Sequence, residues 1–156
     1  MTNKWKKLIL CLAIPLATGG VATLLSMKGI QQYEQMRHAP FSPPEWVFPV
    51  VWTILYLMMG YASYRVLTSD ADAGQIHKAL QVYGIQLALN FLWPLLFFGL
   101  EMYLTAFIVL LALWVAIFLT IRAFGDIDEL AADLLLPYIV WVTFAGYLNV
   151  GAYLLN

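Results

Sequence analysis

Residues 42–56 read Ser42-Pro43-Pro44-Glu45-Trp46-Val47-Phe48-Pro49-Val50-Val51-Trp52-Thr53-Ile54-Leu55-Tyr56 and open a long apolar segment with prolines and aromatic side chains. Prolines near a helix start cost little, because the first backbone N–H groups have no intrahelical acceptor. Pro49 lacks the N–H that would pair with the Glu45 carbonyl, so the sequence predicts an irregular helix end with that carbonyl unpaired. An irregular, aromatic-rich helix end in so apolar a chain indicates a docking place for a flat, hydrophobic molecule.

The composition is that of a membrane protein. Of the 156 residues, 63% are apolar and 11% are charged, whereas a soluble domain carries about 25% charged residues. Apolar runs long enough to cross a bilayer occur at about residues 5–27, 46–66, 79–100, 102–123 and 134–155. The sequence therefore predicts an all-α integral membrane protein, a bundle of five transmembrane helices that forms a single domain over residues 1–156.

The distribution of basic residues predicts the orientation in the membrane. The N-terminus and the even-numbered loops carry six of the eight basic residues, and the opposite side carries Lys28 and Arg37. By the positive-inside rule the N-terminus is cytoplasmic and the C-terminus outside, with a bacterial cell membrane as the expected location. The lysines before the first span also fit a secretory signal, but that span is long and lacks a small-residue cleavage site.

The connections between the spans differ in character. The longest, residues 28–45, contains Tyr33 and Phe41 and is expected to form a folded cap over one end of the bundle, although a flexible loop with interfacial aromatic residues is an alternative. Residues 68–75 are polar and small and should form an exposed loop. Glu101 alone separates the third and fourth spans, which predicts a tight hairpin.

The third span places polar and aromatic side chains on one helical face. Gln86, Asn90, Trp93 and Phe97 follow one another at helical spacing, and Pro94 should kink the helix near the middle of the membrane. Amides in hydrocarbon need partners, so this face should point into the bundle. The amides then either only bridge helices or also line a cavity.

Small residues accompany aromatic ones on two other spans. The fifth span presents Trp141, Ala145, Leu148 and Asn149 at helical spacing, and the first presents a small face of Pro15, Gly19, Thr23 and Ser26. Small residues allow either close helix approach or a pocket wall. Gly84 and Ala88 form another small pair, which predicts a contact surface between helices or between two copies of the chain.

Some chemistries are disfavoured by the sequence. No Asp, Glu, Lys, Arg or His lies at the centre of a span, although proton relays and ion pathways normally need such a group. His38 and His77 lie on opposite sides of the predicted membrane, and Cys11 is the single cysteine. A histidine pair on haem iron within the bilayer, a disulfide within the chain and a metal site are therefore not expected.

Several motifs in order resemble the translocator protein family, also called tryptophan-rich sensory proteins or peripheral-type benzodiazepine receptors. The similarity covers nearly the whole chain and rests on Pro15 with Gly19-Gly20, Pro43-Pro44-Glu45-Trp46, Val51-Trp52-Thr53-Ile54-Leu55-Tyr56, Met59-Gly60-Tyr61, Gln86-Leu87-Ala88-Leu89-Asn90, Trp93-Pro94, Phe97-Phe98-Gly99, Pro137-Tyr138, Trp141, Phe144-Ala145 and Leu148-Asn149.

The resemblance implies a five-helix bundle, commonly dimeric, with a pocket beneath the first long loop that binds protoporphyrin IX and similar flat ligands; no other cofactor is required. By the family's pattern the pocket residues are Thr23, Ser26, Phe48, Pro49, Val51, Trp52, Asn90, Trp93, Trp141, Ala145 and Leu148. Similarity to some bacterial members implies a second activity, the light-dependent oxidative breakdown of protoporphyrin. In this chain that activity would use Trp52 and Trp141.

The chain also departs from the family's pattern. The stretch His38-Ala39-Pro40-Phe41 stands where the family often has Lys-Pro-x-Trp, so the family's ligand contacts in this loop are not assigned to these residues. The cholesterol motif needs a basic residue after its tyrosine, and none follows Tyr147 or Tyr153. Sterol binding through that motif is not expected.

Three functions follow as alternatives. The first is a membrane tetrapyrrole-binding protein that acts as a sensor, scavenger or carrier. The second is light-dependent oxidative degradation of protoporphyrin IX, and the third is transport of tetrapyrroles or other small amphiphiles. The absence of an internal sequence repeat argues against the architecture of many energised transporters.

Overall fold

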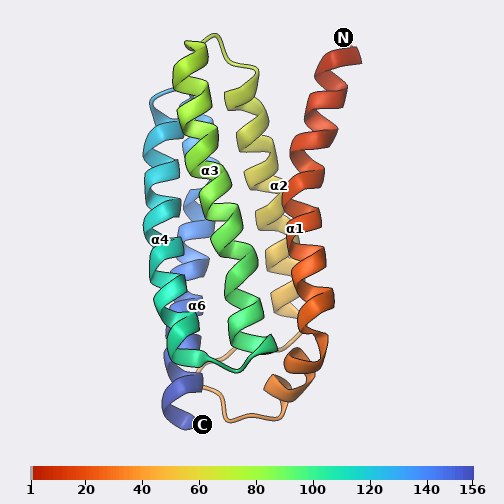
Figure 1. The fold of residues 1–156 in the computed structure, drawn as a ribbon, viewed down its shortest axis with the longest axis vertical. Helices are drawn as coiled ribbons and strands as arrows, with labels where there is room; N and C mark the ends of the chain where they lie inside the picture. Colours follow the sequence, from red (N-terminus) through yellow and green to blue (C-terminus); the bar gives the residue numbers. More distant parts are fainter. Residues whose placement is uncertain (1) are drawn as a thin grey trace.

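A computed structural model describes residues 2–156 as a bundle of long helices (Figure 1). The elements are α1 (Thr2–Glu34), α2 (Val47–Leu67), α3 (Ala73–Pro94), the π-helix η1 (Leu95–Gly99), α4 (Tyr103–Gly125), α5 (Glu129–Leu134) and α6 (Leu136–Leu155). Helices α1, α2 and α4, together with α3–η1 and α5–α6, give five spans long and apolar enough to cross a membrane. The predicted all-α fold with five spans is confirmed.

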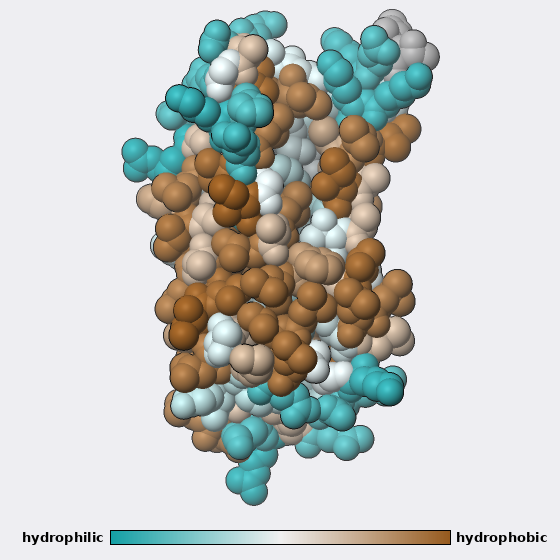
Figure 2. All heavy atoms as spheres, in the orientation of Figure 1, coloured by the Kyte–Doolittle hydropathy of each residue, from teal (hydrophilic) through white to brown (hydrophobic). Residues whose placement is uncertain are grey.

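The surface of the bundle has the layering of a membrane protein. Apolar side chains form a wide band around the middle of the visible face, and polar side chains gather at both ends (Figure 2). Large apolar residues on this surface, such as Ile9, Leu24, Ile108 and Val140, are more than half exposed. In water such exposure would be costly, whereas in a bilayer these side chains contact lipid.

The first long connection is shorter than predicted. Helix α1 continues to Glu34, so residues 28–34 of the predicted loop are helical and the connection comprises residues 35–46. Gly29 lets this end of α1 lie against η1, because a Cβ atom there would come within 1.6 Å of the Phe98 carbonyl oxygen. The next connection is also shorter, since the Asp72 carboxylate caps α3 by accepting from the Gly74 N–H at 3.1 Å.

Two predictions about prolines are wrong. Helix α2 begins at Val47, so Pro49 lies in its first turn and needs no intrahelical acceptor. The Glu45 carbonyl is not unpaired, because it accepts from the Phe48 N–H at 3.3 Å. Pro94 is the last residue of α3, close to the loop end of the bundle and not at mid-membrane, and the helix continues beyond it as the wider π-turns of η1.

A buried chain of hydrogen bonds joins α2, α3 and α6. The Tyr56 hydroxyl donates to Asn90 Oδ1 at 2.8 Å, and Asn90 Nδ2 donates to the Tyr138 hydroxyl at 2.7 Å. That hydroxyl donates in turn to Gln86 Oε1 at 2.6 Å. Both amides are at least 97% buried, so these bonds replace the water that hydrocarbon cannot supply. Both amides thus bridge helices, and Asn90 also lines the cavity described below, whereas Gln86 does not.

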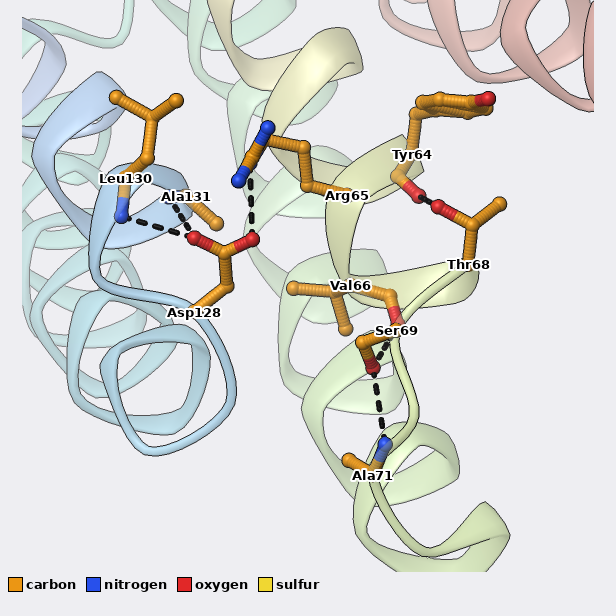
Figure 3. A network of polar contacts seen from close by, with 9 residues as sticks. All are labelled: Tyr64, Arg65, Val66, Thr68, Ser69, Ala71, Asp128, Leu130 and Ala131. Atoms are coloured by element: carbon orange, nitrogen blue, oxygen red, sulfur yellow. Dashed lines mark hydrogen bonds and ion pairs between the residues drawn. The ribbon is translucent and has the colours of Figure 1, made fainter.

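At the end of the bundle where α2 ends and α5 begins, Asp128 joins the two helices (Figure 3). One carboxylate oxygen accepts from the Leu130 and Ala131 N–H groups at 2.9 and 3.4 Å and caps α5. The other accepts from Arg65 Nε at 2.8 Å, which ties the end of α2 to the start of α5. A single side chain therefore provides both the cap of the six-residue helix α5 and its ion pair with α2, in addition to the apolar packing between the two helices.

We expect Asp128→Ala to lower the thermal unfolding temperature more than Asp128→Asn. Alanine removes both the cap and the ion pair, whereas asparagine caps a helix nearly as well as aspartate and removes only the charge. The loss of the cap corresponds to about 1 kcal/mol, or roughly 2–4 °C for a chain of this size. Unfolding in detergent measures both variants, and equal shifts would show that the cap does not contribute.

We expect Tyr138→Phe to lower the unfolding temperature by roughly 3–6 °C, because it leaves Gln86 Oε1 and one Asn90 N–H without partners. An unpaired buried group costs about 1–3 kcal/mol, with the smaller values typical of membrane interiors. Tyr153→Phe is the control, since that side chain is 48% exposed. If the two variants unfold at the same temperature, the buried chain does not stabilise the bundle.

Candidate ligand-binding cavity

A cavity of about 570 Å³ lies between α1, α2, α3, η1 and α6, beneath the connection of residues 35–46. Its volume falls within the range of about 300–1,000 Å³ that is typical of small-molecule sites. The lining consists of Gly19, Ala22, Thr23, Ile30, Tyr33, Glu34, His38, Ser42, Pro43, Pro44, Glu45, Phe48, Pro49, Trp52, Tyr56, Asn90, Trp93, Pro94, Phe97, Phe98, Trp141, Ala145, Leu148 and Asn149. Most of this lining is apolar or aromatic.

One wall is a group of aromatic side chains from α2 and α6. The rings of Trp52 and Trp141 meet edge to face with centroids 6.5 Å apart and an interplanar angle of 84°. Trp52 stacks on Tyr56 at 5.5 Å, and Phe48 meets Trp141 at 5.8 Å. Such pairs hold one another in orientation and leave broad ring faces toward the cavity, where a planar ligand could stack.

The facing wall is built by the end of α3 and by η1. Trp93 stacks on Phe97 at 5.2 Å, and its indole N–H donates to Asn149 Oδ1 on α6 at 2.9 Å. Asn149 in turn donates to the Tyr103 carbonyl at 2.9 Å. The Trp93 ring is therefore fixed from both its apolar and its polar side. A fixed wall of this kind loses little conformational entropy when a ligand binds.

The floor of the cavity is formed by small residues on α1 and by the hydrogen-bonded side chains of Tyr56 and Asn90. A Cβ atom at Gly19 would lie 2.2 Å from Tyr56 Cε2, so only glycine leaves room for the tyrosine ring there. The ring can then reach Asn90, to which its hydroxyl donates. Gly19 thus permits both a close approach and a pocket wall, the two readings that the sequence left open.

The roof is tied to the end of α6. The Tyr147 hydroxyl donates to the Pro40 carbonyl at 2.6 Å, and the Asn156 side chain pairs with the Arg37 backbone at 3.0 and 3.3 Å. A Cβ atom at Gly151 would lie 2.6 Å from the Ala39 side chain, so the connection lies directly on the helix. These contacts favour the folded cap over the flexible loop.

The rim carries the polar groups of the site. His38 Nε2 donates to the Tyr33 carbonyl at 2.7 Å, and the imidazole stacks on the Tyr33 ring with centroids 4.4 Å apart. Glu34 and Glu45 complete the rim, and both side chains are exposed. Within the described lining there is no lysine or arginine.

All but two of the residues predicted to bind the ligand line this cavity: Thr23, Phe48, Pro49, Trp52, Asn90, Trp93, Trp141, Ala145 and Leu148. Val51 does not line it and packs against the apolar core. Ser26 is buried and donates to the Pro94 carbonyl at 3.3 Å, so it joins α1 to α3. In this structure these two side chains pack between elements of the bundle, and their contact with a ligand stays a prediction.

The sequence missed the rim and part of the floor. Tyr33, Glu34 and His38 reach the cavity because α1 extends to Glu34, beyond its hydrophobic span. The signal that could have found them is the absence of a strong helix breaker between Lys28 and Glu34 apart from one glycine. Tyr56 was part of the opening motif, but nothing in the sequence assigned its hydroxyl to Asn90.

Comparisons with known proteins identify the family. The model of the TspO/MBR family matches residues 8–154. Relatives include the tryptophan-rich protein TspO of Chlorobaculum tepidum, 37% identical over 96% of this chain and 95% of the relative, and the tryptophan-rich sensory protein of Cereibacter sphaeroides, 36% identical over 100% and 95%. The human translocator protein is 38% identical over 78% of this chain and 73% of its own length. This chain is a multi-pass integral membrane protein that belongs to the TspO/MBR family.

Proposed function

We propose that this protein binds protoporphyrin IX and similar flat, hydrophobic ligands in the cavity beneath residues 35–46, as a sensor, scavenger or carrier. The observation that carries the proposal is the pair of opposed aromatic walls, with Trp52 and Trp141 on one side and Trp93 on the other. Each ring stacked on a porphyrin would add about 0.5–1.5 kcal/mol beyond the burial of apolar area.

The free-base porphyrin needs no iron ligand, whereas haem needs an unengaged nitrogen that faces the ring plane. His38 is the one histidine in the described lining, and its Nε2 donates to the Tyr33 carbonyl while the Tyr33 ring stacks on it. Its Nδ1, at the rim, is therefore the one histidine nitrogen that the lining could offer to iron. The name of one relative, tryptophan-rich sensory protein, supports a sensory role for such binding.

Titration of the purified protein with protoporphyrin IX in the dark tests the proposal through tryptophan fluorescence. We expect saturable quenching. The affinity for protoporphyrin IX should fall at least severalfold when Trp52→Phe and Trp141→Phe remove stacking area from one wall. Trp5→Phe is the matched control, because Trp5 lies at the opposite end of α1 and is largely exposed. Quenching that does not saturate would contradict the proposed function.

Illumination of the same samples distinguishes binding alone from the second candidate function, light-dependent oxidation of the bound porphyrin. The edge-to-face contact of Trp52 and Trp141 at 6.5 Å inside the cavity is the observation that favours it, because both rings could exchange electrons with an excited porphyrin. A new absorbing product that disappears in Trp52→Phe or Trp141→Phe would support light-dependent oxidation. Loss of porphyrin at equal rates in all variants would exclude a role for these side chains.

We further propose a homodimer, with the N-terminus on the cytoplasmic side and the C-terminus outside. The two termini lie at opposite ends of the bundle (Figure 1), as an odd number of spans requires. Gly84 and Ala88 lie on the outer face of α3, and a Cβ atom at Gly84 would meet nothing within 4 Å. Such a small, exposed pair allows two helices to approach closely.

Gly84→Leu should shift the protein from dimer to monomer in detergent, because the larger side chain separates the two α3 helices. Size-exclusion chromatography with light scattering measures the mass. Gly20→Leu is the control, because Gly20 also has open space around it but lies on α1. A Gly84→Leu protein that remains dimeric would place the interface elsewhere.

A further inference from the structure

The hydrogen-bond donors of the cavity are largely engaged within the protein. The hydroxyl groups of Thr23 and Ser42 donate to the Gly19 and Ala39 carbonyls at 2.8 and 2.6 Å. The Tyr56 hydroxyl and the Trp93 indole donate to the side chains of Asn90 and Asn149. The three hydroxyl groups keep acceptor capacity on their oxygens but offer no free hydrogen to a ligand, and the Trp93 indole has no hydrogen left to offer.

The N-terminus of α2, which borders the cavity, is likewise without free donors. A helix N-terminus normally attracts anions through its unpaired N–H groups. Here the Val47 N–H donates to the Pro44 carbonyl at 3.1 Å, the Phe48 N–H donates to the Glu45 carbonyl at 3.3 Å, and Pro49 has none. The first three residues of α2 therefore give a carboxylate no hydrogen bond.

The charges at the rim also disfavour a ligand that carries a carboxylate. Glu34 and Glu45 line the opening from α1 and from the connection before α2, and the described lining has no lysine or arginine. The free donors that remain among the described lining residues are neutral: the Tyr33 hydroxyl, the indoles of Trp52 and Trp141, and the second amide N–H of Asn90 and of Asn149. The cavity is thus rich in acceptors and negative at its mouth, with aromatic faces that attract cations.

We propose, on the basis of the binding function proposed above, that this cavity selects flat aromatic ligands whose polar edge is a protonated amine over ligands that end in carboxylates. The ring stacks between the aromatic walls, and the amine pairs with Glu34 and Glu45 at the rim. Protoporphyrin IX carries two propionates, which find only neutral donors and no basic side chain in the described lining, so it is held mainly by its ring and less tightly than the same ring with an amine edge.

Three derivatives of one ring test the selection: protoporphyrin IX, its neutral dimethyl ester, and its bis(2-aminoethyl) amide. Each is titrated in the dark, in one detergent, by tryptophan quenching. We expect the diamine to bind the wild-type protein about tenfold more tightly than the diacid, with the ester between them, because each exposed charge contact changes the affinity by about 1.4- to 5-fold.

Glu34→Gln combined with Glu45→Gln should reduce the preference for the diamine to about twofold, whereas Glu101→Gln should leave it unchanged. Glu101 is exposed at the same end of the bundle but does not line the cavity, so it controls for general charge. Comparing the same two ligands between proteins cancels their different partition into detergent. Thermal unfolding confirms that the double variant is folded.

Two results would overturn the selection. One is a diacid that binds the wild-type protein at least as tightly as the diamine, and the other is a preference that persists in full in the double variant. Either leaves the proposed binding function intact, since the ring still binds. If none of the three ligands quenches saturably, the proposed function itself fails, and the selection fails with it.

Discussion

Asn90 provides the interaction on which the rest of the structure depends. Its amide accepts from Tyr56 on α2 and donates to Tyr138 on α6, while its backbone belongs to α3. In hydrocarbon an unpaired amide is costly, so the packing that satisfies all its partners is strongly favoured. Three helices are thereby held in one register, and the aromatic rings that they carry are fixed with them.

The cavity follows from this constraint. A pocket with only apolar contacts in a membrane could close, because lipid-like side chains lose little by repacking. Here Tyr56 is held by its hydroxyl at Asn90, and Trp93 is held by its indole at Asn149. Neither ring can rotate into the space without losing a buried hydrogen bond, which costs about 1–3 kcal/mol. The roof, attached through Tyr147 and Asn156, covers space that the rings leave empty.

The sequence predicted the spans and most of the cavity wall because both depend on local patterns. Apolar length fixes the spans, and the helical spacing of Asn90 and Trp93 places both on the inner face. Apolar length alone did not predict the rim, because α1 continues past its apolar stretch to Glu34, where Gly29 lies against η1, a contact that is remote in sequence. Spacing also does not separate Ser26 and Val51 from the lining residues, because one residue on an inner face can bond a neighbouring helix or fill the core instead of facing the cavity.

The same hydrogen bonds that hold the cavity open also determine its chemical character. A donor spent on holding a ring in place is no longer available to a ligand, so a site stabilised through its hydroxyl, indole and amide hydrogens becomes rich in acceptors. Among the donors of the described lining that stay free, the indole N–H of Trp141 is buried without a partner. An unpaired buried donor raises the free energy of the empty site, and a ligand with one inward acceptor would relieve that cost. The empty cavity is therefore rigid but not fully satisfied, a combination that favours occupation by a ligand over collapse.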